Sequence, residues 1–242
     1  MKKPDNQNYV KRMAKLAGKA MHDYDMIKNG DNIAVALSGG KDSFTLLHIL
    51  SSRRKWIPVD YNIIAVHVNI NMPCNTAIDK EYLENICNEM NIQFIIKTLE
   101  IPDAERSPCF WCAWNRRKAL FDACEENNCS KLALGHHKDD ITETLLLNLF
   151  YHGEFSTMPA KLDFFKGKLT LIRPIAYLEE HQTRRYTDEF GFNSSTCDQV
   201  YADKSKRIMV KNLIKELKKE IPGIKSNLFN SMKKQIKTDY VL

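Results

Sequence analysis

Short apolar runs alternate with segments of helical periodicity along most of the chain. Five runs are predicted to be strands: 33–37, 61–69, 94–100, 131–134 and 169–175. The first is apolar throughout and rich in β-branched residues, and the first two are typical of strands buried on both faces of a parallel sheet. Three segments among them repeat apolar residues at helical spacing: 77–90, 141–151 and 179–190. Strands that alternate with helices favour parallel pairing, because each crossover needs a connecting element. The pattern predicts an α/β fold with a five-stranded, mostly parallel sheet and helices on both faces.

Helical segments are predicted at both ends of this α/β unit. Apolar residues recur at helical spacing from 9 to 28, and Gly30 follows as a stop signal. From 203 onward an amphipathic helix runs to Pro222, where Pro-Gly breaks it, and a last helix follows. We therefore divide the chain into an N-terminal helical segment (1–29), an α/β domain (30–192) and a basic C-terminal helical segment (193–242).

Length and composition limit the size of the core, the expected location of the protein and the chemistry of its cysteines. With 242 residues the chain is long enough to bury one large core without disulfides or structural metals to stabilise it. No apolar run approaches the roughly 20 residues of a membrane span, and no signal-peptide pattern follows Met1, so we expect a cytoplasmic location and no membrane partner. The seven cysteines should then be mostly thiols, which makes a C-x-x-C pair a metal or redox candidate.

The first apolar run leads into a glycine turn and a helix start, expected from 44 to 50. The residues of the turn are Ser38, Gly39, Gly40, Lys41, Asp42 and Ser43. Both glycines can adopt positive φ and lack a Cβ, so backbone N–H groups can close around an anion. The Walker A spacing is absent, which disfavours a GTPase or motor ATPase. The hexapeptide resembles the PP-loop, the pyrophosphate-binding signature of enzymes that adenylate a substrate; the alternative is a plain turn between strand and helix.

Polar residues follow two other predicted strands. His67 stands near the end of the second strand, where an adenine ring is expected in an open α/β sheet, although it could equally be a satisfied buried histidine. Gly135 ends the fourth strand and is assigned to the same nucleotide site. Asp139 and Asp140 follow and are placed to hold Mg²⁺ on ATP phosphates, although one of them could be a helix N-cap.

Cys109 and Cys112 stand three residues apart at a predicted loop-to-helix junction and could both reach one metal. Three cations follow that would help to keep thiolates ionised: Arg116, Arg117 and Lys118. A redox pair is the alternative, without a thioredoxin-like context. Cys87 and Cys124 lie in helix-like segments and are expected to be packing residues.

Most of the cationic excess lies in the C-terminal quarter. The lysines and arginines there lie off the apolar side of the predicted helix: Lys204, Lys206, Arg207, Lys211, Lys215, Lys218 and Lys219. Such a face could bind the backbone of an RNA or could be only a solvated face.

Four motifs together resemble those of the tRNA 2-thiocytidine synthetase family of PP-loop proteins, in order from about residue 30 to 174. They are S-G-G-K-D-S, C-x-x-C-A-x-x-R-R-x-A-L, G-H-H-K-D-D-I-x-E-T and F-Y-x-G-x-x-x-x-M-P-x-K-L. The resemblance implies ATP-dependent replacement of the C2 oxygen of tRNA cytidine 32 by sulfur. An adenylated intermediate and a sulfide bound to an iron-sulfur cluster would carry the transfer.

The same resemblance implies cofactors and partners. A 4Fe-4S cluster would be held by Cys109, Cys112 and Cys197, although the sequence around Cys197 is S-S-T-C-D where family members commonly show P-C-x-x-C-G. Mg²⁺ would bind Asp42 with Asp139 or Asp140, and Lys41 would offset charge in the transition state. The implied partners are tRNA and a sulfur donor, either cysteine desulfurase or sulfide, with a homodimer as a candidate assembly.

Three other functions compete with this one. A nucleobase desulfidase would use the same cluster but needs no ATP. A zinc-stabilised RNA-binding protein without activity would want a fourth metal ligand, for which there is no obvious residue. An amidating or lysidine-forming PP-loop enzyme would leave the C-x-x-C pair unexplained.

Overall fold

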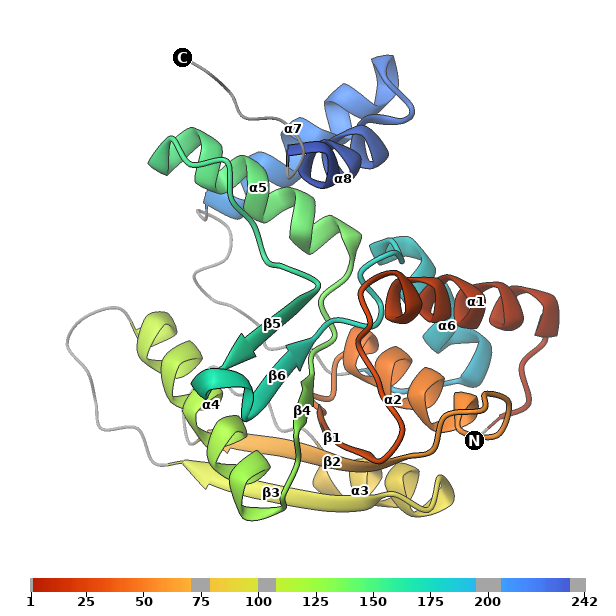
Figure 1. The fold of residues 1–242 in the computed structure, drawn as a ribbon. Coiled ribbons are helices and arrows are strands. Elements are labelled where there is room, and N and C mark those ends of the chain that lie inside the picture. Colours follow the sequence, from red (N-terminus) through yellow and green to blue (C-terminus); the bar gives the residue numbers. More distant parts are fainter. Residues whose placement is uncertain (1, 71–78, 100–107, 195–205, 236–242) are drawn as a thin grey trace.

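The computed structural model describes residues 2–70, 79–99, 108–194 and 206–235, arranged as a sheet surrounded by helices (Figure 1). Six strands of the described part form the sheet: β1 (Asp31–Ala36), β2 (Tyr61–Ile70), β3 (Gln93–Leu99), β4 (Lys131–Ala133), β5 (Lys161–Phe164) and β6 (Leu169–Ile172). Their order is β3-β2-β1-β4-β6-β5, and only the β5–β6 pair is antiparallel. Chain order reverses between β1 and β4, the kind of switch point at which open α/β sheets bind ligands.

Helices cover both faces of the sheet, as predicted. They are α1 (Gln7–Asp23), α2 (Lys41–Arg53), α3 (Lys80–Glu89), α4 (Pro108–Glu126), α5 (Lys138–His152), α6 (Glu180–Phe190), α7 (Lys206–Glu220) and α8 (Ile224–Gln235). Because side chains alternate along a strand, Ile33 and Val35 of β1 join the larger core with α1, α2 and α6, whereas Ala34 joins the core beneath α4. The predicted α/β class is therefore confirmed.

The terminal helices pack on this unit in different ways. Met13 and Ala17 of α1 are fully buried in the larger core, so the N-terminal helix is continuous with the α/β unit. The C-terminal helices α7 and α8 pack on α5 around a small separate cluster that contains Leu146, Val210 and Ile214 (Figure 1). The three-part division of the chain stays a prediction.

The prediction of five strands is wrong, because β5 was missed. β5 is a four-residue edge strand, K-L-D-F, with two exposed residues, and it lacks the continuous apolar run of a buried strand. A short 3-10 turn, Phe165–Gly167, joins it to β6, and all three of its residues have positive φ. Only the glycine of that turn gives a conventional signal for such a backbone.

Several element ends also differ from the sequence prediction. Helix α2 begins at Lys41 rather than 44, so the second half of the loop hexapeptide is its first turn. Strand β6 ends at Ile172, because the chain turns between Arg173 and Ala176 around Pro174, which has no N–H to donate. Helix α1 stops before Asp25, which has φ +45°. The expected helix starts at 77 and 203 lie outside the described residues. No helix in the described ranges is long and apolar enough to cross a membrane.

Candidate functional site

The turn between β1 and α2 has the backbone of an anion-binding loop. Gly39 has φ +83°, whereas Gly40 has φ −82° and is the N-cap of α2, so only one of the two glycines uses the left-handed region. Since Gly40 has no side chain, no side-chain cap hydrogen bond covers the start of the helix. The free N–H groups and the helix dipole there favour a phosphate.

Two serine hydroxyls hold this loop in shape. The Oγ atoms of Ser38 and Ser43 lie 3.2 Å apart, and the Ser43 hydroxyl donates to the carbonyl of Gly40 at 2.8 Å. Ser43 is buried. The hydroxyls therefore bond within the loop, and Lys41 and Asp42 lie on the first turn of α2.

Gly135 allows the end of β4 to approach this first turn. A Cβ at Gly135 would lie 3.0 Å from the carbonyl carbon of Asp42 and 3.1 Å from the backbone nitrogen of Ser43. These are backbone atoms, which cannot swing aside as a side chain would. The predicted nucleotide-site glycine thus brings the loop after β1 and the turn after β4 together across the switch point.

Asp42 and the carboxylates after β4 meet at His137. This histidine is 4% exposed, and its Nε2 lies 3.7 Å from Asp42 Oδ1. Its Nδ1 lies 3.2 Å from a carboxylate oxygen of Asp140 and 3.9 Å from one of Asp139. Lys41 and Thr183 also donate hydrogen bonds to Asp42. The structure therefore brings the three predicted magnesium ligands around one side chain.

The cap of α5 is His137 rather than either aspartate. Its side chain accepts from the backbone N–H of Asp140, and the Asp140 carboxylate accepts from the N–H of His137, which forms a reciprocal capping box. Asp140 therefore has a structural role as the third residue of the helix, and Asp139 has none in capping.

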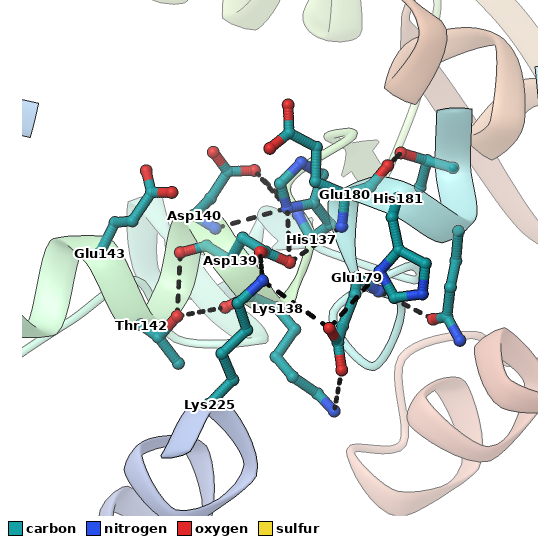
Figure 2. Close-up of polar contacts among 12 residues, drawn as sticks. His137, Lys138, Asp139, Asp140, Thr142, Glu143, Glu179, Glu180, His181 and Lys225 are labelled. Carbon is teal, nitrogen blue, oxygen red and sulfur yellow. Dashed lines mark hydrogen bonds and ion pairs between the residues drawn. The ribbon is translucent and has the colours of Figure 1, made fainter. Parts of the chain in front are cut away.

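Asp139 instead forms an ion pair with a lysine from the C-terminal helices (Figure 2). The carboxylate is almost fully buried and accepts from Lys225 of α8 and from the backbone N–H of Glu180. Burial alone would raise the pKa of Asp139, but these two hydrogen bonds and the charge of Lys225 outweigh it, so the pKa lies below its ordinary value. Lys225 also lies 3.7 Å from Glu179.

Two further cations of α7 pair with acidic side chains beside the same site. Lys211 lies 2.6 Å from Glu180, whose other oxygen is 3.6 Å from Lys41. Arg207 lies 3.0 Å from Glu143. A pocket of about 460 Å³ opens between α5, α6, α7 and α8, and Asp139 and Lys225 are among the residues that line it. The basic helices therefore border the candidate nucleotide site.

His67 is buried at 1% exposure in β2. Its Nδ1 lies 2.8 Å from the carbonyl of Leu37, while its Nε2 has no hydrogen-bond partner among the described residues. Burial is the main cause that lowers the pKa of His67, so the ring is neutral near pH 7. Only one of the two ring nitrogens of His67 therefore has a hydrogen-bond partner among the described residues, and the contact of His67 with adenine stays a prediction.

Cys109 and Cys112 belong to the first turns of α4, at positions three apart on one helix. Cys112 is half-buried, and the guanidinium of Arg116 lies 3.8 Å from its sulfur, which favours a thiolate. The side chain of Cys109 and all of Cys197 and Cys74 lie outside the described residues. The other thiols are buried, and burial raises the pKa of Cys87 and Cys124 to about 12 and that of Cys129 to about 11.

Among the described thiols, Cys112 is partly exposed, whereas Cys87, Cys124 and Cys129 are buried. Cys87 and Cys124 are packing residues, as predicted. In the described part of the chain no three histidine, cysteine, aspartate or glutamate side chains form a group that could hold a metal ion. The three-cysteine set therefore stays a prediction.

Comparison with known proteins decides the family. The chain matches the PP-loop domain over residues 6–214. It is 39% identical over 231 residues to the tRNA-cytidine(32) 2-sulfurtransferase of Syntrophotalea carbinolica, covering 92% of this chain and 88% of that protein. It is 36% identical over 239 residues to the tRNA-cytidine(32) 2-sulfurtransferase of Burkholderia cenocepacia, covering 96% and 72%. This chain belongs to the tRNA-cytidine(32) 2-sulfurtransferase family of PP-loop proteins. The family predicted from the four motifs is confirmed, and with it the prediction of an enzyme.

A solved structure supports the fold assigned to this 2-sulfurtransferase family member. The U34-tRNA thiolase NcsA from Methanococcus maripaludis, determined with its 4Fe-4S cluster, matches with a TM-score of 0.76 and 24% identity, covering 96% of this chain and 80% of that one. At this identity the likeness concerns the fold.

Several residues of the PP-loop site were missed in the sequence. His137 lies inside the G-H-H-K-D-D motif and could have been chosen from it, since an imidazole between carboxylates is a frequent arrangement in active sites. Thr183 and Glu180 of α6 stand in no motif, and Lys225 is one of many lysines in the tail. Their contacts with Asp42, Lys41 and Asp139 are visible only in the folded chain.

We predict that Gly135→Ala lowers ATP affinity about tenfold. The new methyl group would push the first turn of α2 by a few tenths of an ångström, because its nearest neighbours are backbone atoms of Asp42 and Ser43. Calorimetric titration with ATP would measure the effect. The control is Gly30→Ala, which meets no atom within 4 Å but has φ +83°. It should cost about 1 kcal/mol of stability and leave ATP affinity unchanged. Equal ATP affinity for the two variants would refute the role of Gly135.

Proposed function

We propose that this protein uses ATP to replace the C2 oxygen of cytidine 32 in tRNA by sulfur. The observation that carries the proposal is the S-G-G-K-D-S loop at the switch point, facing the G-H-H-K-D-D turn, in a chain of the 2-sulfurtransferase family. The relatives of this family are named for that reaction.

ATP is needed because the C2 oxygen of cytosine is a poor leaving group. Attack of this oxygen on the α-phosphorus of ATP would release pyrophosphate and leave an O-adenylate. Sulfide would then add at C2, and AMP would depart with the original oxygen. The first step converts the poor leaving group into AMP, the second lets sulfide displace it, and neither step consumes a reductant.

The PP-loop residues bind and orient ATP in this scheme. The backbone N–H groups from Gly39 to Ser43 hold the pyrophosphate portion, and Lys41 offsets the charge that develops on it. Asp42 with Asp139 or Asp140 would hold Mg²⁺, which supplies positive charge to the phosphates. The nearness of all three carboxylates to His137 supports this assignment. Lys225 must leave Asp139 if Asp139 is to bind the metal.

Cys109, Cys112 and Cys197 would hold the 4Fe-4S cluster, which when bound offers an open iron position that carries sulfide as the nucleophile. The start of α4 supports this proposal through the i, i+3 spacing of its two cysteines and through Arg116 beside Cys112. The solved thiolase with the same fold contains such a cluster. The cytoplasmic location, the sulfur donor, either cysteine desulfurase or sulfide, and a homodimer remain parts of the proposal.

The basic C-terminal helix supports tRNA as the substrate. Lys215 and Lys218 of α7 are exposed beside the pocket that Asp139 lines. Lys211 is less available than predicted, because it pairs with Glu180. A phosphate backbone that crosses α7 would therefore pass close to the candidate nucleotide site.

Charge reversal on α7 should weaken tRNA binding. We expect Lys215→Glu with Lys218→Glu to lower the affinity for tRNA. The slope of log K against log salt should become shallower by about 1 to 2, because binding releases fewer counterions when fewer phosphates are contacted. Filter binding of unmodified tRNA over a salt series measures both quantities. The control is Lys166→Glu with Lys168→Glu, which changes the net charge equally in the exposed turn between β5 and β6. If both pairs shift the slope alike, α7 is only a solvated face.

The proposed reaction is tested by nucleoside analysis of tRNA from a strain that lacks the gene and from the complemented strain. The proposal expects 2-thiocytidine to vanish in the first and to return in the second. Normal 2-thiocytidine in the deletion strain would refute it. A brown protein with absorbance near 400 nm after anaerobic purification is the expected sign of the cluster.

A further inference from the structure

The C-terminal end of α5 and the segment after it carry an exposed aromatic ledge. Every residue from 149 to 156 is exposed. We define the ledge as Phe150, Tyr151 and Phe155, whose exposed fractions are 50%, 37% and 40%. Three large rings within six residues place much apolar surface in water, which marks an interaction site more often than a structural one. The ledge belongs to no part of the nucleotide site described above.

Cations of α7 border the ledge. The ammonium of Lys206 lies 4.1 Å from the centre of the Tyr151 ring, and the Tyr151 hydroxyl lies 3.6 Å from the sulfur of Met209. Arg207 follows next along the helix, and α7 contains six lysines and arginines against two glutamates. Flat rings beside a basic helix are the combination with which proteins bind unpaired bases and the backbone that joins them.

We propose that the ledge stacks unpaired bases of the anticodon loop, an inference that rests on the proposed function. Phe150 follows Asp140 by ten residues on α5, so the rise along the helix from the two aspartates to the start of the ledge is roughly 15 Å. The stacked bases are therefore not the base that reacts. Their role is to hold the loop while cytidine 32 occupies the nucleotide site.

The charge pattern favours RNA over a second protein copy. The core of a protein–protein interface is depleted in charged residues, whereas here Lys206 lies over one of the three rings. An ammonium on a tyrosine ring leaves the neighbouring phenylalanine faces free for bases and offers a charge to the backbone. Phe150 and Phe155 are thus RNA-binding residues that affect affinity and not the chemical step.

The test is the double variant Phe150→Ala with Phe155→Ala. We expect the Kd and the KM for unmodified tRNA to rise at least about tenfold, since base–aromatic stacking is lost. The kcat at saturating tRNA should change less than about twofold, and the salt slope should not change, because the rings release no counterions. Restoring rings with Phe150→Tyr and Phe155→Tyr should recover the affinity.

Two controls separate this effect from a general loss of aromatic surface. Trp56→Ala and Phe165→Ala remove rings that are 83% and 60% exposed and that lie outside the ledge, between α2 and β2 and in the turn before β6. Both should leave Kd and KM unchanged. A blunt-ended RNA duplex should bind the wild type and the double variant equally, because all of its bases are paired and are not available for stacking.

Unchanged Kd and KM in the double variant would overturn the proposal, as would an equal loss of affinity for the blunt-ended duplex. A change of oligomeric state in analytical ultracentrifugation at unchanged tRNA affinity would assign the ledge to a second copy and would also overturn it. If the wild type bound no tRNA, the proposed function would fall together with the ledge. Binding by the wild type with unaffected variants overturns the ledge alone.

Discussion

Replacing Asp42 by Ala, or Lys41 by Ala, should lower the rate of tRNA thiolation by about 100- to 1000-fold or more. Both side chains lie on the first turn of α2, where they bond to each other at 2.9 Å and would face the phosphates of ATP. Removing a preorganised charge from such a position typically costs that much in kcat. Formation of 2-thiocytidine and of AMP, followed at saturating ATP, would measure the loss.

The fold should survive these changes. Both side chains are only partly buried, so the lost ion pair and the lost hydrogen bond from Thr183 should cost about 1 kcal/mol of stability. Ser52→Ala on the last turns of α2 is the matched control and should keep full activity. Thiolation at the normal rate by either PP-loop variant would contradict the assignment of this loop to ATP.

Replacing Cys109, Cys112 or Cys197 by Ala should remove iron and thiolation together. A cluster that three cysteines would hold should be lost when only two remain, whereas the PP-loop is built from β1 and α2 and should bind ATP as before. Iron and sulfide content, the absorbance near 400 nm and the ATP Kd should be measured on the same anaerobic preparation.

Buried thiols provide the control for the cysteine variants. Cys87→Ala and Cys124→Ala remove neutral thiols from the two cores and should leave iron content and activity in place. An active Cys197→Ala variant with normal iron would refute the three-cysteine cluster. Stoichiometric zinc in place of iron in the anaerobic wild type would instead favour the inactive RNA-binding alternative.

The central strands could be predicted because a buried strand leaves its signal, a run of apolar residues, within one short segment of sequence. Strands β1, β4 and β6 lie inside the sheet and consist mostly of buried apolar residues, the pattern that burial on both faces requires. Strand β5 pairs along one edge only and exposes Leu162 and Asp163, so it has neither the apolar run nor a clear alternation. In the turn that follows, Phe165 and Lys166 both have positive φ, a conformation that neither residue type predicts.

The residues of the candidate site likewise fall into those that a local motif marks and those that only the packing of the chain brings in. The loop at Ser38 and the pair Asp139 and Asp140 could be predicted because each stands in one short motif beside a strand end. The contact of Thr183 with Asp42 spans 141 residues, and that of Lys225 with Asp139 spans 86. No local pattern marks either partner, since their positions follow from the packing of α6 and α8 on the α/β unit.

The central claim, that ATP activates the C2 oxygen of a tRNA cytidine for replacement by sulfur, can be tested by following that oxygen. The anaerobic protein would be incubated with ATP, Mg²⁺, sulfide and a tRNA whose cytidine 32 carries oxygen-18 at C2. The account predicts one labelled AMP for each 2-thiocytidine formed, because the oxygen leaves with the adenylate. Formation of 2-thiocytidine with unlabelled AMP, or with ADP and phosphate as the products of ATP, would contradict it.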